Sequence, residues 1–277
     1  HAPLPSPLRP HCLARDRLRL WQPVESRTAR DNGGKLLAIT DADLERVLTV
    51  INVSWAKGTR ESYGAGLLLF HVFCDLKSVP EQQRCPVDSL LILAFVSSCA
   101  GSYSGKTLSN YIYAIRAWHI LHGQPWRMEQ NELNAALDGA AALAPPTSKR
   151  PKRAPFTLEI VLKIRHQLDL SQPLDAATYA CLTNALYALA RLGEFTLTNL
   201  KCFDPTKHVK RSDVEIDATD HNGLKIIRIH LPETKVSKDG EDVYYAEQSD
   251  LSDPKAAFLN HFAVNNPTSN DPLFAWR

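Results

Sequence analysis

The chain has 277 residues, of which 44% are hydrophobic, and this is enough for two domains of ordinary size with substantial cores. No apolar run approaches the length of a membrane span, and the proline-rich start lacks the apolar stretch of a secretory signal, so we expect no membrane partner. The net charge of +2 conceals an asymmetry, because residues 1–155 hold 19 Lys and Arg against 13 Asp and Glu, whereas residues 156–277 hold 13 against 17. The basic front half suits a polyanionic partner, although ordinary surface variation also accounts for an excess of this size.

The cysteines lie far apart in the sequence and form no Cys-x-x-Cys pair. They are Cys12, Cys74, Cys85, Cys99, Cys181 and Cys202. This spacing does not suit a zinc site, and most of the six stand in apolar helical text, where a free thiol behaves as a small hydrophobe. We therefore expect no metal site and a reducing compartment.

The first 39 residues predict a partly ordered leader in which Leu18, Leu20 and Trp21 are able to pack against a domain. From residue 40 the apolar residues recur at helical spacing, and short turns separate five predicted helices. These cover approximately residues 40–55, 61–76, 86–101, 104–122 and 128–143. The third is apolar on all sides and is expected to be central. Five helices with brief connections predict a small bundle over residues 40–144.

The predicted helix at residues 104–122 has two distinct faces. One face is apolar and comprises Leu108, Tyr111, Ile112, Ile115 and Trp118. The other face carries cations and neutral polar groups but no acid, and comprises Lys106, Ser109, Asn110, Tyr113 and Arg116. Such groups hydrogen-bond phosphates and base edges, and the backbone amides of Lys106 and Thr107 at the helix start suit an anion. The face is a candidate DNA-binding surface, with an ordinary solvated face as the alternative.

Two further basic segments are candidates for DNA contact. The first is a short turn before the second helix, with Lys57, Thr59 and Arg60. The second is a proline-rich linker at residues 145–156, which marks a domain boundary. Its cations are Lys149, Arg150, Lys152 and Arg153. The linker suits an arm on DNA or a nuclear address, and a plain charged linker explains it equally well.

Residues 157–169 predict the first helix of a second domain, and residues 177–200 predict a long helix that is buried on nearly every side. The last turn of the long helix carries Arg191, Gly193 and Glu194. An arginine at the end of a buried helix needs an anion. Glu194 offers a structural ion pair as a helical neighbour, whereas a phosphate offers a bidentate partner. The residues of this helix leave both interpretations open.

After this helix the period of the apolar residues changes from 3.6 to 2, which predicts strands. The strands fall at residues 213–217, 223–231 and 242–246. A turn sequence joins the last two as a hairpin, with Lys235 near the start of its loop, and a helix follows at residues 254–264. The sequence therefore predicts a mainly α chain with a small antiparallel sheet, in which residues 157–277 form an α+β domain.

Three short motifs follow one another in this second domain. They are ARLGEF at residues 190–195, LPETK at residues 231–235 and DPLF at residues 271–274. With the helical bundle and the basic linker before them, their order and spacing resemble the tyrosine recombinases, the phage-integrase-like DNA strand-exchange enzymes. The nearer likeness is to the recombinase-like genes of eukaryotic mobile elements of the Crypton kind. The resemblance covers approximately residues 40–277.

The resemblance implies a core-binding helical bundle of the SAM-like kind and a catalytic domain, which hold double-stranded DNA from opposite sides and self-associate on it. In this family a tyrosine attacks the scissile phosphate and leaves a 3′-phosphotyrosyl link. By resemblance, Arg191 binds this phosphate, Glu194 orients Arg191, and Lys235 is the general acid, with Lys238 as the alternative lysine. Gly193 matches a position where the backbone approaches DNA or a neighbouring helix closely.

The resemblance also implies a reaction, DNA recombination or integration, that needs no cofactor and no small-molecule substrate. It places the protein in the nucleus if the source is a eukaryote, and otherwise in the cytoplasm.

The sequence departs from the family pattern in its second motif, His-x-x-Arg, which should follow DPLF together with the nucleophilic tyrosine. The one match, His208 with Arg211, precedes the sheet and is interpreted as a coincidence in a loop. Tyr244 and Tyr245 lie in a predicted strand and are poor nucleophiles. The catalytic domain is therefore expected to be incomplete at its C-terminal end, and the chain to bind DNA without cleaving it. Two alternatives are a non-catalytic DNA-binding regulator on the same scaffold and a helical protein-interaction module.

Overall fold

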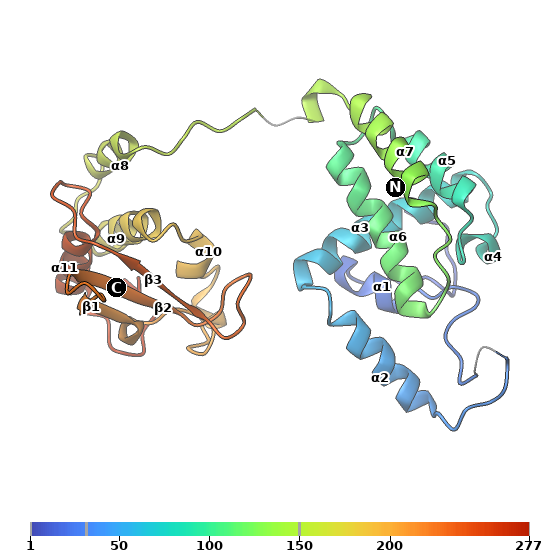
Figure 1. Cartoon of the computed structure of the whole chain (residues 1–277), viewed down its shortest axis with the longest axis horizontal. Helices are drawn as coiled ribbons and strands as arrows, with labels where there is room; N and C mark the ends of the chain where they lie inside the picture. Colours follow the sequence, from blue (N-terminus) through green and yellow to red (C-terminus); the bar gives the residue numbers. More distant parts are fainter. Residues whose placement is uncertain (1, 31–32, 149–150, 277) are drawn as a thin grey trace. The chain divides into compact units, whose positions relative to one another are not determined.

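The computed structural model describes residues 2–30, 33–148 and 151–276, and the chain divides into two compact units at residues 1–152 and 153–277 (Figure 1). The described part of the first unit contains helices and no strand, and the second unit combines helices with a three-stranded antiparallel sheet. The predicted fold class, mainly α with a small antiparallel sheet, is confirmed. Within the described residues, no helix is both long and apolar enough to cross a bilayer.

The first unit contains two short 3-10 turns and seven α-helices in its described residues. They are η1 (Ala14–Asp16), α1 (Arg17–Leu20), α2 (Asp41–Asn52), α3 (Lys57–Leu76), α4 (Glu81–Arg84), α5 (Ser89–Cys99), α6 (Gly105–His122), α7 (Gln130–Ala142) and η2 (Pro146–Ser148). The four-residue helix α4 was not predicted.

Local capping explains where α2 and α6 begin and end. The Thr40 side chain accepts a hydrogen bond from the backbone N–H of Asp43, and the Asp43 side chain accepts one from the backbone N–H of Thr40, which closes a capping box. Ser104 caps α6 by accepting from a backbone N–H. Gly123 ends α6 in the left-handed conformation, with φ of 72°. Both helices lie within a few residues of their predicted positions.

Two predictions in the first unit are wrong. Residues 57–60 are not a turn but the first turn of α3, because the Arg60 N–H already bonds to the Ala56 carbonyl. The helix predicted at residues 86–101 begins only at Ser89, where the Asp88 side chain accepts from the Leu90 N–H. This helix, α5, is also not buried on all sides: it packs against α6 and α7 on one side, and Leu90 is 71% exposed.

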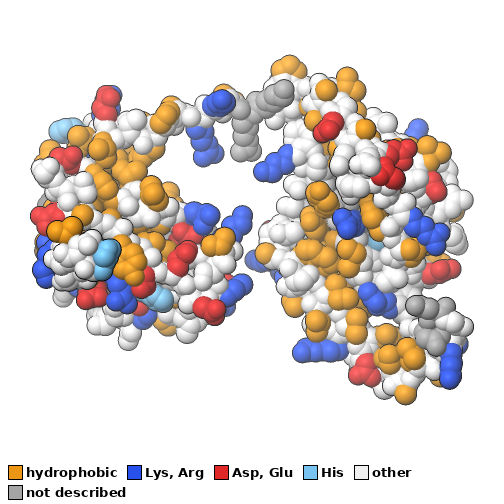
Figure 2. Space-filling view, viewed as in Figure 1, with side chains coloured by type: hydrophobic (Ala, Val, Ile, Leu, Met, Phe, Trp, Pro, Cys, Tyr) orange, Lys and Arg blue, Asp and Glu red, His pale blue; other side chains and the backbone are white. Residues whose placement is uncertain are grey.

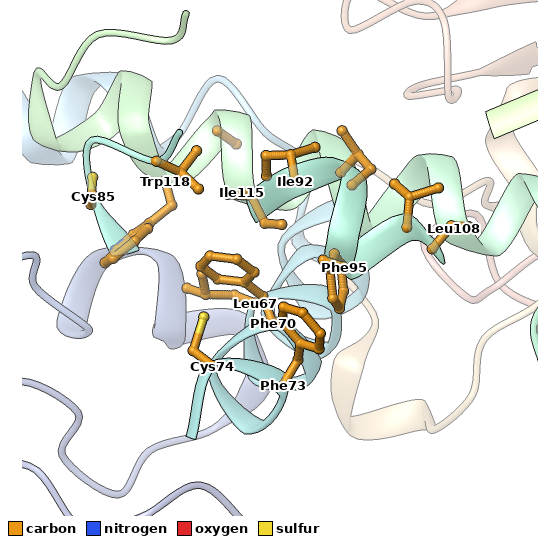
Figure 3. Packing of buried hydrophobic residues seen from close by; sticks show 14 of the residues in the cluster. Leu67, Phe70, Phe73, Cys74, Cys85, Ile92, Phe95, Leu108, Ile115 and Trp118 are labelled. Carbon is orange, nitrogen blue, oxygen red and sulfur yellow. The ribbon is translucent and has the colours of Figure 1, made fainter. Parts of the chain in front are cut away.

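Aromatic and aliphatic side chains from α3, α5 and α6 form the core of the first unit (Figure 3). Phe70 of α3 and Phe95 of α5 lie edge to face, with ring centroids 5.6 Å apart. Leu67, Ile115 and Trp118 are fully buried beside them. Burial of such large side chains is the main source of stability for the helices that carry them.

The segment predicted as a leader contributes to this core. Leu18 and Trp21 are buried in it, while Leu20 is 43% exposed. The indole Nε1 of Trp118 donates a hydrogen bond to the Trp21 carbonyl at 2.6 Å. The compact first unit therefore includes residues before position 40.

The second unit contains helices on both sides of its sheet in sequence order. Its elements are α8 (Leu158–Arg165), α9 (Pro173–Tyr187), α10 (Leu192–Phe195), η3 (Leu200–Cys202), η4 (Arg211–Asp213), β1 (Val214–Thr219), β2 (Lys225–Leu231), β3 (Glu241–Tyr245) and α11 (Pro254–Asn265). The strands lie in the order β1–β2–β3, and Leu231 of β2 pairs with Glu241 of β3, so the predicted hairpin is confirmed. Alternate β2 residues Ile227, Ile229 and Leu231 face the core.

The long helix predicted through residue 200 is wrong, because α9 ends at Tyr187. Leu189 adopts the left-handed conformation with φ of 52°. The Ala190 N–H bonds to the Ala185 carbonyl and the Leu189 N–H to the Leu186 carbonyl, which is the Schellman arrangement that closes a helix. The chain then begins the separate short helix α10 after this turn.

Candidate functional site

Eight residues from three segments line a shallow pocket of about 390 Å³ in the second unit. They are Arg191, Gly193, Glu194, Lys207, His208, Glu233, Thr234 and Lys235. The segments are the start of α10, the loop before η4 and the loop between β2 and β3. Figure 2 shows Lys and Arg side chains mixed with Asp and Glu at the edge of this unit where Figure 1 labels α10. The three candidate catalytic residues thus lie in one pocket although they are far apart in the sequence.

Arg191 lies at the start of α10 and holds an ion pair with Glu194, in which 62% of the Arg191 side chain and 11% of the Glu194 side chain are exposed. Glu194 accepts two hydrogen bonds of 2.8 Å, one from the Arg191 backbone N–H and one from its Nη1. Arg191 is therefore not buried, and the argument that burial forces it to find an anion is wrong. A pair this exposed contributes about 0–1 kcal/mol.

The Glu194 contact leaves most of the guanidinium available. Neither Nε nor Nη2 of Arg191 has a hydrogen-bond partner among the described residues. Because an arginine fork binds carboxylates and phosphates in pairs of hydrogen bonds, the remaining edge is able to bind an oxyanion.

Gly193 stands in open space beside this arginine. A Cβ placed on it meets no atom within 4 Å. No neighbouring helix in the described structure therefore requires a glycine here. The close approach of a bound partner remains a prediction for this position.

The loop between β2 and β3 places Lys235 in the pocket. Thr234 is 5% exposed, and its Oγ1 accepts hydrogen bonds from the N–H groups of Val236 and Ser237, at 3.3 and 3.0 Å. The adjacent Lys235 is exposed and its ammonium has no partner among the described residues. Lys238, the alternative lysine, lies outside the pocket lining and instead donates to Glu233 at 2.9 Å.

The carboxylates of the pocket are occupied by cations. Glu194 bonds to Arg191, and Glu233 bonds to Lys238, whose hydrogen bond lowers the pKa of Glu233. Arg191, Lys207 and Lys235 supply three cations against these two acids. The pocket is therefore suited to bind an anion.

None of the eight lining residues is a tyrosine, serine or cysteine. Tyr245 donates its hydroxyl to the buried Asn184, and burial raises its pKa far above the ordinary value. Tyr244 donates its hydroxyl to Asp242 at 3.1 Å. The residues that line the pocket are able to bind and polarise a phosphate, but they include no nucleophile for it.

Sequence reasoning missed Lys207 and His208, which the structure places in the pocket. The pairing of His208 with Arg211 was interpreted as a coincidence, and the structure separates the two residues. The Arg211 guanidinium stacks on Phe262, 4.0 Å from the ring centroid, and does not line the pocket. The His-x-x-Arg spacing was the available signal, but nothing in the sequence showed that the loop before η4 lies beside Arg191.

The candidate DNA-binding face of α6 is solvent-accessible as predicted. Lys106, Tyr113 and Arg116 are exposed, and Ser109 and Asn110 are half-buried. All five stand opposite the buried residues Leu108, Ile112, Ile115 and Trp118. The two-faced pattern of α6 is confirmed.

One detail of the predicted anion site at the start of α6 is wrong. The Thr107 backbone N–H already donates to the Ser104 side chain at 3.2 Å, and the Thr107 hydroxyl lies 2.9 Å from the same oxygen. The cap therefore occupies the Thr107 amide, so this N–H is not free for an anion.

The first turns of α3 lie near the polar face of α6. Burial and, after it, the neighbouring Tyr113 raise the pKa of Tyr63, which shows that the two phenols are close. One turn before Tyr63 stands Arg60, whose Nε is buried without a hydrogen-bond partner. Lys57 and Thr59, on the same first turn, are exposed and half-buried. The structure therefore brings together two candidate contact segments that are separate in the sequence.

The basic linker is only partly described. Lys152 and Arg153 are exposed and belong to no helix or strand. Lys149 and Arg150 lie outside the described residues. Within the described ranges there is no group of three or more side chains suited to hold a metal ion.

Comparison with known proteins adds no assignment. No protein-family model matches the chain, and no curated protein matches it at a significant level. Function is therefore argued from the residues and their geometry.

Proposed function

We propose that the chain is a double-stranded DNA-binding protein of the tyrosine recombinase type, acting in DNA recombination or integration. In this proposal the pocket of Arg191 and Lys235 binds one backbone phosphate. The observation that carries it is the convergence of Arg191, Glu194 and Lys235 on one pocket from segments far apart in the sequence.

The chemistry of the pocket supports a phosphodiester as its ligand. The free edge of the Arg191 guanidinium binds two phosphate oxygens, while Glu194 fixes its orientation. The Lys235 ammonium, on a loop and without a partner of its own among the described residues, donates to an oxygen of the same group. Strand cleavage through a phosphotyrosine is part of the proposal, with the nucleophile supplied from outside the pocket lining.

The polar face of α6 supports backbone contact elsewhere on the duplex. Lys106 and Arg116 are exposed cations on a helix that carries no acid, and Arg60 lies near the same face. Contacts of this kind position a protein on DNA without reading its sequence. Self-association on DNA and a nuclear location in a eukaryote belong to the proposal through the family resemblance.

A salt series tests DNA binding by the complete chain. Because each phosphate contact releases counterions, the logarithm of the affinity for a duplex should fall linearly with the logarithm of salt concentration. The double variant Lys106→Ala, Arg116→Ala should reduce the slope by about 2. Lys77→Ala is the matched control, since Lys77 is an exposed lysine at the other end of α3. Affinity that is insensitive to salt would favour the protein-interaction module.

A nicked suicide duplex tests the catalytic part with the complete gene product. A covalent protein–DNA adduct supports the recombinase, and binding without an adduct supports the specific alternative, a non-catalytic regulator on the same scaffold. Arg191→Ala should abolish adduct formation and weaken duplex binding only modestly, because one phosphate contact is lost among several. An unchanged cleavage rate in Arg191→Ala would remove the catalytic role.

A further inference from the structure

The loop at residues 204–208 is closed by its own hydrogen bonds. The Asp204 carboxylate accepts from the Thr206 N–H at 3.0 Å and from the Thr206 hydroxyl at 2.6 Å, and these bonds lower its pKa. The backbone N–H groups of Lys207 and His208 both donate to the Asp204 carbonyl. This bonding fixes the loop before any ligand arrives, so its side chains are presented to the pocket in a set geometry.

The same loop fixes the tautomer of His208. The Asp204 backbone N–H donates to Nδ1 of His208 at 2.9 Å, and a backbone N–H has no other role than donor. Nδ1 of the neutral ring is therefore the acceptor, and the ring proton stands on Nε2. Phe203 lies against the ring with centroids 6.1 Å apart and a plane angle of 30°.

The Nε2 of His208 has no hydrogen-bond partner among the described residues, although the ring lines the pocket with Arg191 and Lys235. A structural histidine whose only task is to close the loop needs its Nδ1 alone. We infer that His208 is a further ligand of the proposed site, donating its Nε2–H to a non-bridging oxygen of the phosphodiester that Arg191 binds. The inference rests on the proposed function and extends it to a residue outside the three motifs.

Lys207 adds charge to this donor. It forms a loose pair with Asp204, at 3.8 Å, and 59% of its side chain is exposed. Its ammonium is therefore free to turn toward the same anion. Arg211, four positions after Lys207, is held on Phe262 and takes no part.

The tautomer is tested first, by nitrogen-15 NMR of the ring nitrogens in the complete chain at neutral pH. His208 should carry its proton on Nε2. His230 is an internal reference with the opposite arrangement, because its Nδ1 lies 2.7 Å from an Asp242 carboxylate oxygen. Protonation of His208 on Nδ1 in the neutral ring would overturn the inference.

Two substitutions then separate the structural task from the ligand task. His208→Asn keeps an acceptor near the position of Nδ1 and loses the distal donor, whereas His208→Gln keeps a donor that reaches the position of Nε2. We expect His208→Asn to weaken duplex affinity about tenfold with unchanged thermal stability, which is the effect of one charge-assisted hydrogen bond. His208→Gln should retain most of the affinity.

The outcomes distinguish this inference from the proposed function. If His208→Asn binds the duplex like the wild type while Arg191→Ala binds less tightly, His208 is structural and the proposed function stands. If the wild type shows no salt-dependent binding of the duplex and no NMR shift of His208 with inorganic phosphate, both fall. A shift of His208 Nε2 and the Arg191 guanidinium together with inorganic phosphate, without duplex binding, keeps the anion site and rejects DNA as its ligand.

Discussion

Both units contain arginines paired with carboxylates, and the two sets differ in what surrounds them. In the first unit the Arg84 Nη2 lies 2.7 Å from the Asp75 carboxylate, with 6% and 8% of the two side chains exposed. Arg9, from the N-terminal segment, joins the same cluster and is equally enclosed. In the second unit the Arg191–Glu194 pair has a similar length, 2.8 Å, but 62% of the arginine is exposed.

The difference teaches that the pairing itself does not reveal the role of an arginine. The Arg84 guanidinium also donates from Nε and Nη2 to the Val79 carbonyl, so its donors are used inside the protein. The Arg191 guanidinium keeps Nε and Nη2 without a partner in the described structure. Burial and saturation mark the first arginine as structural, whereas exposure and free donors mark the second as available to a ligand.

The largest expected effect comes from removing one carboxylate from each set. Asp75→Ala should lower the free energy of unfolding of the first unit by about 3–5 kcal/mol, because it leaves two enclosed guanidinium groups without their anion. Glu194→Ala should cost the second unit only about 0–1 kcal/mol. Hydrogen exchange during urea unfolding of the complete chain reports each unit separately. Equal losses in the two units would contradict the distinction.

Acid should also affect the first unit more than the second. Burial lowers the pKa of His119 and His122 to about 4, and burial with the Arg9 and Arg84 charges lowers that of His71 well below its ordinary 6.5. The unfolded chain binds protons below pH 6.5 while the folded unit does not, so stability falls as pH drops from 6.5 toward the folded pKa values.

Each of these histidines should cost about 1–2 kcal/mol between pH 6.5 and 5, above the range where carboxylates usually titrate. The second unit has one such histidine among its described residues, His261, whose pKa is also lowered by burial. Hydrogen exchange at several pH values measures both units in one chain. A parallel decline in the two units would show that the buried histidines do not control the acid response.

Gly193→Ala sharpens the comparison by altering the pocket without disturbing the fold. The added Cβ meets no atom within 4 Å, and α10 is a helix, so stability should stay equal or rise by about 0.5–1 kcal/mol. Duplex affinity should fall severalfold, because the methyl group projects where the phosphate approaches Arg191. Affinity equal to that of the wild type would show that no ligand approaches this backbone.

Much of the fold was predictable because local signals coincide with the actual helix ends. Thr40, Ser104 and Gly123 each carry the side chain or backbone freedom that their capping position requires, and the two-faced pattern of α6 requires only helical periodicity. The end of α9 was not predictable, because Leu189 occupies a left-handed position that sequence normally marks with glycine. Tertiary packing decided this ending against local preference.

The site was predictable only in part for a related reason. Arg191 and Lys235 stand in short motifs with a family resemblance, and the structure places both in one pocket. His208 stands in a loop whose position depends on the folding of the whole second unit. No local pattern states that this loop and the start of α10 become neighbours, so the third contributor to the pocket was visible only in the structure.

The smallest expected effect concerns the turn that leads from α9 to Arg191. A side chain at a left-handed position costs about 1–2 kcal/mol, and glycine gives back about 0.5–1 kcal/mol through the flexibility of the unfolded chain. Leu189→Gly should therefore stabilise the second unit by about 0.5 kcal/mol, since its side chain is 90% exposed and little burial is lost. Leu189→Ala is the control, because it keeps the Cβ and should give no gain.

Duplex affinity should be the same in Leu189→Gly as in the wild type, because the backbone angle that directs the chain to Arg191 is retained. Thermal unfolding and a binding titration on the same variant measure both quantities. A stabilised variant with full affinity would show that the exposed arginine depends on the course of the backbone and on Glu194. Loss of affinity with unchanged Arg191 hydrogen exchange would instead show that the Leu189 side chain itself touches the ligand, and the available surface of the second unit would then extend beyond the pocket to the end of α9.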